Sequence, residues 1–343
     1  MGRPVVSESA PGHDCVYATS GWGIHDDRWV GGLRSVGYTP IIVSLGRDAT
    51  DVTALRLAVR EAGRDLPVLA GPLHSITRHL VDLPVSVVGL SWGYDMDELG
   101  DPSWLAGLDG LIVDSSTNHD TARRAGLPSD RITFLPWGID LERFPLDGPR
   151  VVPLDLRLAS GSPLIVSLRA HEPLYRVDDI VEAFTLACAD VPEAALVIGH
   201  DGSMTPALKD RVLGAGLDGR VRFVGRLPEP DLAPLLRGAT AYVTAAAADG
   251  TSVTLLQAMA CGAPVVASAT PGNRGWVDEG RTGRLFEVGD VEGLAGRLIE
   301  ACRSDSADQV RAARRLVERD ADWQANLPRL RSAMAAAAAS RHP

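Results

Sequence analysis

Short apolar runs alternate with amphipathic stretches along the first half of the chain. Such apolar runs are typical of strands buried in a parallel sheet, and the amphipathic stretches between them are typical of helices. The alternation therefore predicts a doubly wound α/β sheet. The predicted strands are 15–19, 40–44, 68–70, 85–90, 111–114 and 132–135, and the predicted helices are 28–36, 52–62 and 75–83.

The same alternation resumes after residues 144–163, a stretch rich in proline and glycine that is expected to link two domains. A chain of 343 residues also exceeds the usual size of a single hydrophobic core. The second half is therefore predicted to form another Rossmann-like unit, followed by helices from residue 291 and a frayed end at 335–339. Its predicted strands are 164–168, 195–198, 221–224, 241–244 and 264–268, with helices at 177–189, 205–214 and 232–237 and a short helix before the last strand.

Residues 248–268 contain the most informative pattern: a polar loop with glycine, then a short apolar helix, Gly262 and a buried strand. The free amides and the positive dipole end of such a helix favour a phosphate at its N-terminus. Asp249 precedes the helix, and Gln257 lies about two turns along it. An ordinary helix cap and a polar residue on an exposed helix face are the plain alternatives. The candidate ligands are Asp249, Gly250, Thr251, Ser252, Val253 and Gln257.

This segment resembles the donor-binding signature of GT-B glycosyltransferases of the large retaining family 4, Glu-Gly-x-x-x-x-x-x-Glu-Ala-Met-Ala-x-Gly-x-Pro-Val-Val-Ala. In that family the first carboxylate contacts hydroxyls of the donor sugar and the second holds the ribose of the nucleotide. Asp249 and Gln257 replace the two glutamates here. Asp249 is one methylene shorter and Gln257 carries no charge, so the resemblance leaves the donor nucleotide and sugar open.

Two further segments of the second half resemble the same family. Residues 167–176 resemble a variant of its phosphate-binding loop, with Arg169 directly after a strand and Arg176 as the second cation. Positive charge is needed there because the leaving diphosphate gains charge as the glycosidic bond breaks. Surface salt bridges are the alternative for both arginines. Gly199, His200 and Asp201 resemble the family's strand-end turn that faces the donor, which plain turn geometry also explains.

Two loops of the first half are expected to face the acceptor. Gly21, Trp22, Gly23, His25 and Asp26 follow the first strand, where glycines let a sugar or diphosphate approach the backbone. Asp26 is equally suited to cap the next helix, and His25 to a turn. Residues 91–95 resemble a Ser-Trp-Gly-x-Asp variant of the family, so the resemblance makes Trp92 and Tyr94 cleft residues and Asp95 a contact of the acceptor or donor sugar; capping a turn is its alternative role.

Composition excludes several partners. The net charge of −10 argues against nucleic acid and against adsorption to an anionic membrane, and no apolar run is long enough for a transmembrane helix. The N-terminus lacks the apolar core of a signal peptide, and Cys15, Cys188, Cys261 and Cys302 lack zinc-site spacing, which favours a cytoplasmic protein. Asp95 and Asp97 have the spacing of a metal-binding Asp-x-Asp, but their context matches the Ser-Trp-Gly-x-Asp element. No obligatory metal or other cofactor is therefore expected.

The resemblance implies a GT-B fold with two Rossmann-like domains facing a cleft. Residues 1–150 would bind the acceptor and 151–321 the nucleotide-sugar, UDP- or GDP-linked, and the last helix, about 322–343, would cross back to the first domain. The expected reaction transfers a sugar with retention to a small soluble acceptor (a sugar, a natural-product scaffold or a small thiol), with Arg169, Asp249 and Asp95 as catalytic candidates. A nucleotide-sugar-binding protein without catalysis is the main alternative. An NAD-dependent oxidoreductase is disfavoured because no Gly-x-Gly-x-x-Gly opens a helix. The oligomeric state is left open, a homodimer included.

Overall fold

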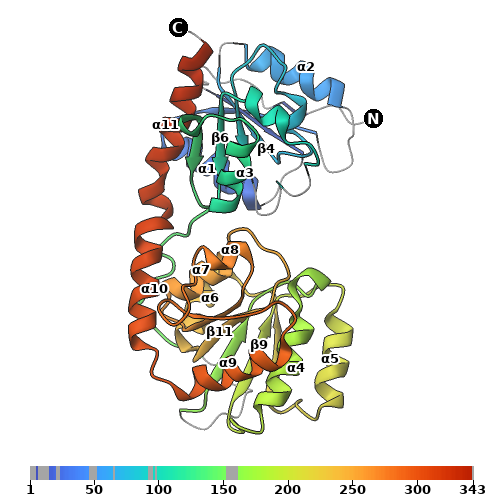
Figure 1. The fold of residues 1–343 in the computed structure, drawn as a ribbon, viewed down its shortest axis with the longest axis vertical. Helices are drawn as coiled ribbons and strands as arrows, with labels where there is room; N and C mark the ends of the chain where they lie inside the picture. Colours follow the sequence, from blue (N-terminus) through green and yellow to red (C-terminus); the bar gives the residue numbers. More distant parts are fainter. Residues whose placement is uncertain are drawn as a thin grey trace. The chain divides into compact units, whose positions relative to one another are not determined.

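The chain folds into two units, each built on a mainly parallel sheet (Figure 1). The computed structural model describes residues 5–6, 15–20, 24–45, 52–64, 66–91, 96, 99–151 and 161–341. One unit consists of Met1–Pro136 with Gln324–Pro343, and the other of Trp137–Trp323. Residues 137–150 lie in the second unit, where the Ile139 amide donates to the Ala321 carbonyl (2.8 Å) and Phe144 is buried in the core.

The N-terminal unit contains a seven-stranded sheet in the order β1-β3-β2-β4-β5-β6-β7. Only β1 runs antiparallel to its neighbour within the described part of this sheet, and the other pairs are parallel. The six longer strands match the predicted apolar runs closely. The strands are β1 (Val5–Val6), β2 (Cys15–Thr19), β3 (Pro40–Ser44), β4 (Val68–Gly71), β5 (Val87–Leu90), β6 (Gly110–Val113) and β7 (Ile132–Phe134).

Helices cover both faces of this sheet, as the alternation of side chains along β2 requires. Val16 and Ala18 pack into one core with Leu55 of α2, whereas the Tyr17 hydroxyl donates to Asp26 of α1 on the opposite face. The α-helices of this unit are α1 (Ile24–Ser35), α2 (Val52–Ala62), α3 (Ser116–Arg124) and most of α11 (Trp323–Arg341).

The helix predicted at 75–83 is wrong. Only a 3-10 turn forms there, Thr77–His79, and the chain around it consists of turns between Pro72 and Pro84. The Thr77 hydroxyl donates to the Ala70 carbonyl (2.7 Å), which ties the turn to the end of β4. Pro72 and Pro84 restrict the backbone on the two sides of this segment. The spacing of its apolar residues alone therefore predicted a longer helix than the segment forms.

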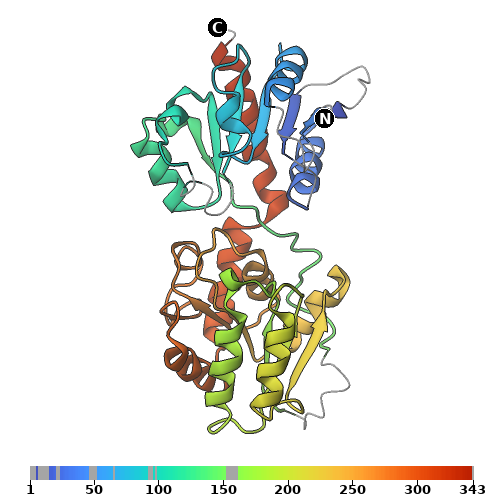
Figure 2. The same cartoon turned by 90° about the vertical axis from the view of Figure 1, so that its right-hand side faces the viewer.

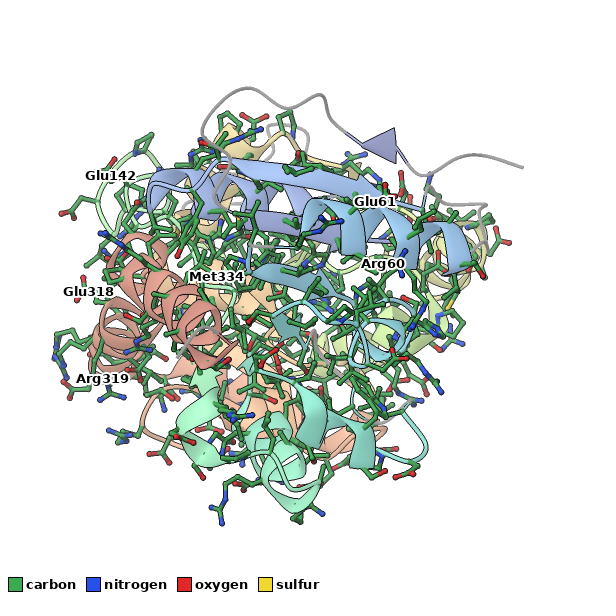
Figure 3. All side chains as sticks on the ribbon, turned by 90° about the horizontal axis from the view of Figure 1, so that it is seen from above. Arg60, Glu61, Glu142, Glu318, Arg319 and Met334 are labelled. Atoms are coloured by element: carbon green, nitrogen blue, oxygen red, sulfur yellow. The ribbon has the colours of Figure 1, made fainter. Side chains whose placement is uncertain are left out.

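The last helix, α11, begins in the C-terminal unit at Trp323 and packs its remaining length on the N-terminal unit (Figure 2). The Ser86 hydroxyl donates to the Ala337 carbonyl (2.6 Å), and Leu330, Met334 and Ala337 are fully buried. Figure 3 labels Met334 on α11, and Arg60 and Glu61 on the exposed side of α2. The frayed end expected at 335–339 is therefore wrong, because these alanines continue a docked helix.

The C-terminal unit contains a six-stranded parallel sheet in the order β10-β9-β8-β11-β12-β13. Its strands again match the predicted runs, with β13 added at the edge. They are β8 (Leu164–Ser167), β9 (Ala195–Gly199), β10 (Val221–Gly225), β11 (Ala241–Thr244), β12 (Val265–Ser268) and β13 (Arg284–Phe286).

Two hydrophobic cores lie on the two faces of this sheet. Ile165 of β8 packs with Ile180 of α4 and Leu298 of α9, whereas the adjacent Val166 packs with Leu256 of α7 and Leu236 of α6. The helices are α4 (Val177–Ala187), α5 (Thr205–Gly214), α6 (Glu229–Gly238), α7 (Val253–Ala260), α8 (Pro271–Arg274), α9 (Val291–Arg303) and α10 (Ala307–Asp320). None of the helices in the described ranges is both long and apolar enough to cross a membrane.

Candidate active site

The strand order of the C-terminal unit indicates where a ligand binds. From β8 the chain proceeds outward through β9 and β10, then crosses to β11 on the other side of β8. Open α/β sheets bind ligands beyond the carboxyl ends of the strands at such a switch point. Arg169 follows β8 and Asp249 follows β11, so both lie in loops at this position.

Arg169 and Asp249 form a nearly buried ion pair. Nη2 of Arg169 lies 2.9 Å from Oδ2 of Asp249, and the two side chains are 11% and 14% exposed. Nη1 of Arg169 donates to the Ser252 hydroxyl at 2.9 Å. Burial raises the pKa of Asp249, although Arg169, the Ser252 hydroxyl and the Gly250 amide partly offset that effect.

The N-terminus of α7 lies beside this pair. Ser252 is the N-cap residue, but its side chain makes no hydrogen bond to the first-turn amides of α7 and instead accepts from Arg169. In the same region, the hydroxyl groups of Tyr242 and Thr254 are 2.6 Å apart. Burial raises the pKa of Tyr242 to about 12. A guanidinium and uncapped helix amides together suit an anionic group such as a phosphate.

Gln257 lies on α7 and is buried, with 9% of its surface exposed. Its Oε1 atom has no hydrogen-bond partner among the residues that the structure describes. A buried amide oxygen without a partner is costly, and a ligand donor removes that cost. The expectation that Gln257 contacts a ribose hydroxyl stays a prediction.

The loop before α7 rests on the start of α8, a contact that the sequence did not reveal. An added Cβ on Gly272 would lie 1.9 Å from the Gly250 carbonyl oxygen and 2.2 Å from that of Asp249. Thr270 caps α8 by accepting from the Asn273 amide, and the Asn273 side chain donates to the Ser268 carbonyl (2.9 Å). The signal available in the sequence was Thr270 followed by Pro271, a typical helix start.

The side chain of Arg176 is paired with a carboxylate of the next helix. Arg176 adopts a left-handed backbone conformation (φ 47°) immediately before α4. Its Nε and Nη2 donate to the two carboxylate oxygens of Asp179, at 2.7 and 3.1 Å. The aromatic ring of Tyr175 is the group that lies against Arg169, with its centroid 4.2 Å from Cζ.

Gly199, His200 and Asp201 form the turn after β9. His200 is left-handed (φ 73°), and its amide donates to the Gly225 carbonyl of β10. Asp201 is exposed and accepts from Nε of Arg226 (2.9 Å), which lowers its pKa. Left-handed backbone at a residue other than glycine is uncommon and concentrates at functional sites.

The acceptor-side residues of the N-terminal unit are only partly described. His25 is exposed in the first turn of α1, and Asp26 is buried and accepts from Tyr17 at 2.9 Å. Six predicted residues lie outside the described residues: Gly21, Trp22, Gly23, Trp92, Tyr94 and Asp95. Among the described residues, no group of three His, Cys, Asp or Glu side chains could hold a metal ion.

Comparison with protein families identifies the unit that carries the site. Residues 155–319 match the family model of the glycosyl transferases group 1. Over this stretch, just under half of the chain, the sequence is similar to that family. The match covers β8 to α10 and therefore includes Arg169, Asp249 and Gln257.

Two curated relatives and one solved structure agree with this assignment. The chain is 26% identical over 148 residues to N-acetyl-alpha-D-glucosaminyl L-malate synthase of Bacillus anthracis (43% of this chain, 38% of the relative). It is 32% identical over 233 residues to glycogen synthase of Mycobacterium tuberculosis (65% and 53%). The chain thus spans about half or less of the length of these relatives.

The structure of Anabaena HepE in complex with UDP superposes with a TM-score of 0.73 at 15% identity, covering 94% of this chain and 99% of that one. At this identity the likeness concerns the fold alone. Together with the two parallel sheets, it confirms the predicted GT-B fold class.

Proposed function

We propose that this chain is a glycosyltransferase that moves a sugar from a nucleotide-sugar to a small soluble acceptor with retention of configuration. The observation that carries the proposal is the cluster of Arg169, Asp249 and Ser252 at the N-terminus of α7, beyond the switch point of the C-terminal sheet. The match of residues 155–319 to the family model of the glycosyl transferases group 1 supports it. Binding of UDP by Anabaena HepE supports UDP as the first donor nucleotide to test.

Arg169 is the residue proposed to stabilise the leaving diphosphate. Its guanidinium is pre-oriented by Ser252 and Asp249, so little reorganisation is needed as negative charge develops. The amides of the first turn of α7 would share that charge. In the proposed front-face mechanism, the departing phosphate assists removal of the acceptor proton, so no separate protein base is required.

Asp249 and Gln257 are proposed to contact the sugar and the ribose. Asp249 would contact the sugar through a short side chain that is already paired with Arg169. Gln257 offers the ribose an amide oxygen without a hydrogen-bond partner among the described residues, which can accept from a hydroxyl. The N-terminal unit is proposed to bind the acceptor through the loops after β2 and β5, with Asp95 as the contact to test there. The net charge of −10 favours an acceptor that is not a polyanion.

A thermal-unfolding panel with UDP, GDP, ADP, TDP and NAD, first without metal and then with Mg²⁺, tests the donor site. At a concentration about 100 times the dissociation constant, the bound nucleotide adds about 2.7 kcal/mol of stability. Stabilisation by one nucleoside diphosphate in wild type, reduced in Arg169→Ala but unchanged in the exposed control Arg281→Ala, supports the proposal. Stabilisation by NAD alone contradicts it.

A nucleotide-sugar-binding protein without catalysis is the second candidate. The observation that favours it is the engagement of the Asp249 carboxylate with Arg169, which leaves it less available to a sugar hydroxyl. The two candidates differ in donor hydrolysis. Slow release of sugar from the stabilising nucleotide-sugar in the absence of acceptor identifies an enzyme, whereas binding without any hydrolysis or transfer identifies a binding protein.

A further inference from the structure

Tyr175 lies in the same loop as Arg169 and covers one face of its guanidinium. The loop leaves β8, carries Arg169, and forms a 3-10 turn at Pro173–Tyr175 before α4 begins. The ring centroid of Tyr175 is 4.2 Å from Cζ of Arg169. The guanidinium is therefore held by an aromatic face, by the carboxylate of Asp249 and by the hydroxyl of Ser252.

The backbone around Tyr175 is fixed on both sides. Its amide donates to the Glu172 carbonyl (2.9 Å), and the carbonyl of Leu174 accepts from the Ala247 amide (2.8 Å) in the loop after β11. The ring is half-buried and packs against the core between the sheet and α4. These contacts place the ring before any ligand is bound.

Arg176 closes the same turn from the other side. Its left-handed backbone directs the chain into α4, and its side chain is occupied by Asp179. In this loop the guanidinium of Arg169 thus lies against an uncharged phenol ring, while that of Arg176 is paired with a carboxylate.

We propose that Tyr175 is a positioning residue for Arg169, which holds the guanidinium toward the diphosphate of the donor through a cation–π contact. The inference rests on the proposed function for its consequence in catalysis, but the contact itself exists without donor. A cation over an aromatic face is stabilised by the ring quadrupole, more so when water is excluded. Loss of the ring frees the guanidinium to rotate away from the phosphate position.

The direct test follows the Arg169 Nε–Hε resonance by NMR in the ligand-free chain, assigned with the variant Arg169→Lys. Ring current from Tyr175 displaces this resonance from the position of ordinary arginines. We expect the displacement to persist in Tyr175→Phe, which keeps the ring, and to vanish in Tyr175→Leu. An unchanged resonance in folded Tyr175→Leu overturns the proposal, whether or not any nucleotide binds.

The second readout is UDP affinity by calorimetry and, where transfer is measurable, the separation of kcat from KM. Tyr175→Leu should weaken UDP binding about fivefold and lower kcat more than it raises KM, whereas Tyr175→Phe stays within about twofold of wild type. Arg281→Ala is the matched control, because this arginine is exposed and pairs with Asp278 in a surface turn. Wild-type affinity in Tyr175→Leu with loss in Arg169→Ala refutes the role of Tyr175 alone. Equal affinity in wild type and Arg169→Ala refutes the proposed function instead, and the NMR result still decides the contact.

Discussion

Gly272→Ala tests whether the loop that carries Asp249 must rest on α8. The new Cβ would lie 1.9 Å from the Gly250 carbonyl oxygen, and contacts under 3.0 Å are essentially never seen, so that carbonyl must move by about 1.1 Å. Backbone conformation adds no cost, because the φ of Gly272 lies outside the left-handed range. The overpacking should cost about 1–3 kcal/mol of stability.

The larger effect is expected on the site. The new methyl group pushes the backbone of Gly250 and Asp249 away from α8. Because the Asp249 carboxylate is paired with Arg169, which also donates to Ser252, both of these side chains are displaced as well. A misplacement of about 1 Å can cost about a hundredfold in activity, so transfer by Gly272→Ala should fall by about that factor. The measurements are kcat/KM with the stabilising nucleotide-sugar, and urea unfolding of the same samples.

Gly296→Ala is the control, since nothing lies within 4 Å of its added Cβ on α9. This change should stabilise the helix by about 0.5–1 kcal/mol and leave transfer unchanged. The reasoning is refuted if folded Gly272→Ala transfers sugar as fast as wild type, because the loop would then tolerate the displacement.

Three further changes test the chemistry and the two units separately. Arg169→Ala should reduce kcat about a hundredfold with a smaller change in KM; turnover at the wild-type rate would rule out its role at the leaving diphosphate. His171 is fully buried between the Gly199 carbonyl (3.1 Å) and the Thr205 hydroxyl (2.8 Å), and burial lowers its pKa. In the unfolded chain this imidazole takes up a proton near pH 6.5, while in the folded chain it does not. The free energy of unfolding should therefore fall below about pH 6.5, by up to about 1.4 kcal/mol per pH unit. Urea unfolding of His171→Gln at several pH values should show a weaker dependence of stability on pH. Tyr17→Phe removes one hydrogen bond to buried Asp26 and should cost about 0.5–1.5 kcal/mol in urea unfolding; wild-type stability of this variant would mean that the hydrogen bond contributes nothing.

Much of the sheet architecture was predictable because parallel strands are buried on both faces. The strands β2, β3 and β11 coincide with their predicted runs, because a strand covered on both faces is apolar along its whole length and not only at alternate positions. The helix α3 was missed because its sequence, Ser-Thr-Asn-His-Asp-Thr-Ala-Arg-Arg, is mostly polar, with Asn118 and Ala122 buried. The two-residue β1 is too short to leave a periodic signal.

The parts of the site that lie at strand ends could be predicted from the sequence. The contacts that depend on the direction of individual side chains could not. Arg169 and Asp249 meet because β8 and β11 are neighbours, which follows from the doubly wound pattern. The pairing of Arg176 with Asp179 depends on one left-handed residue, and no spacing rule reveals that conformation. Two contacts depend on how loops pack: that of Tyr175 with Arg169, and that of the Gly250 carbonyl with Gly272. Loop packing leaves no periodic pattern of apolar residues in the sequence.

The docking of α11 has a consequence for how the molecule is made and divided. The N-terminal unit buries Leu330, Met334 and Ala337 of α11, yet these residues are synthesised after the whole C-terminal unit. Domains generally fold as they emerge during synthesis, but the first unit here cannot be finished until the last helix arrives. A fragment of residues 1–136 should therefore expose an apolar face and aggregate, and joining 324–341 to it by a linker should restore a folded unit.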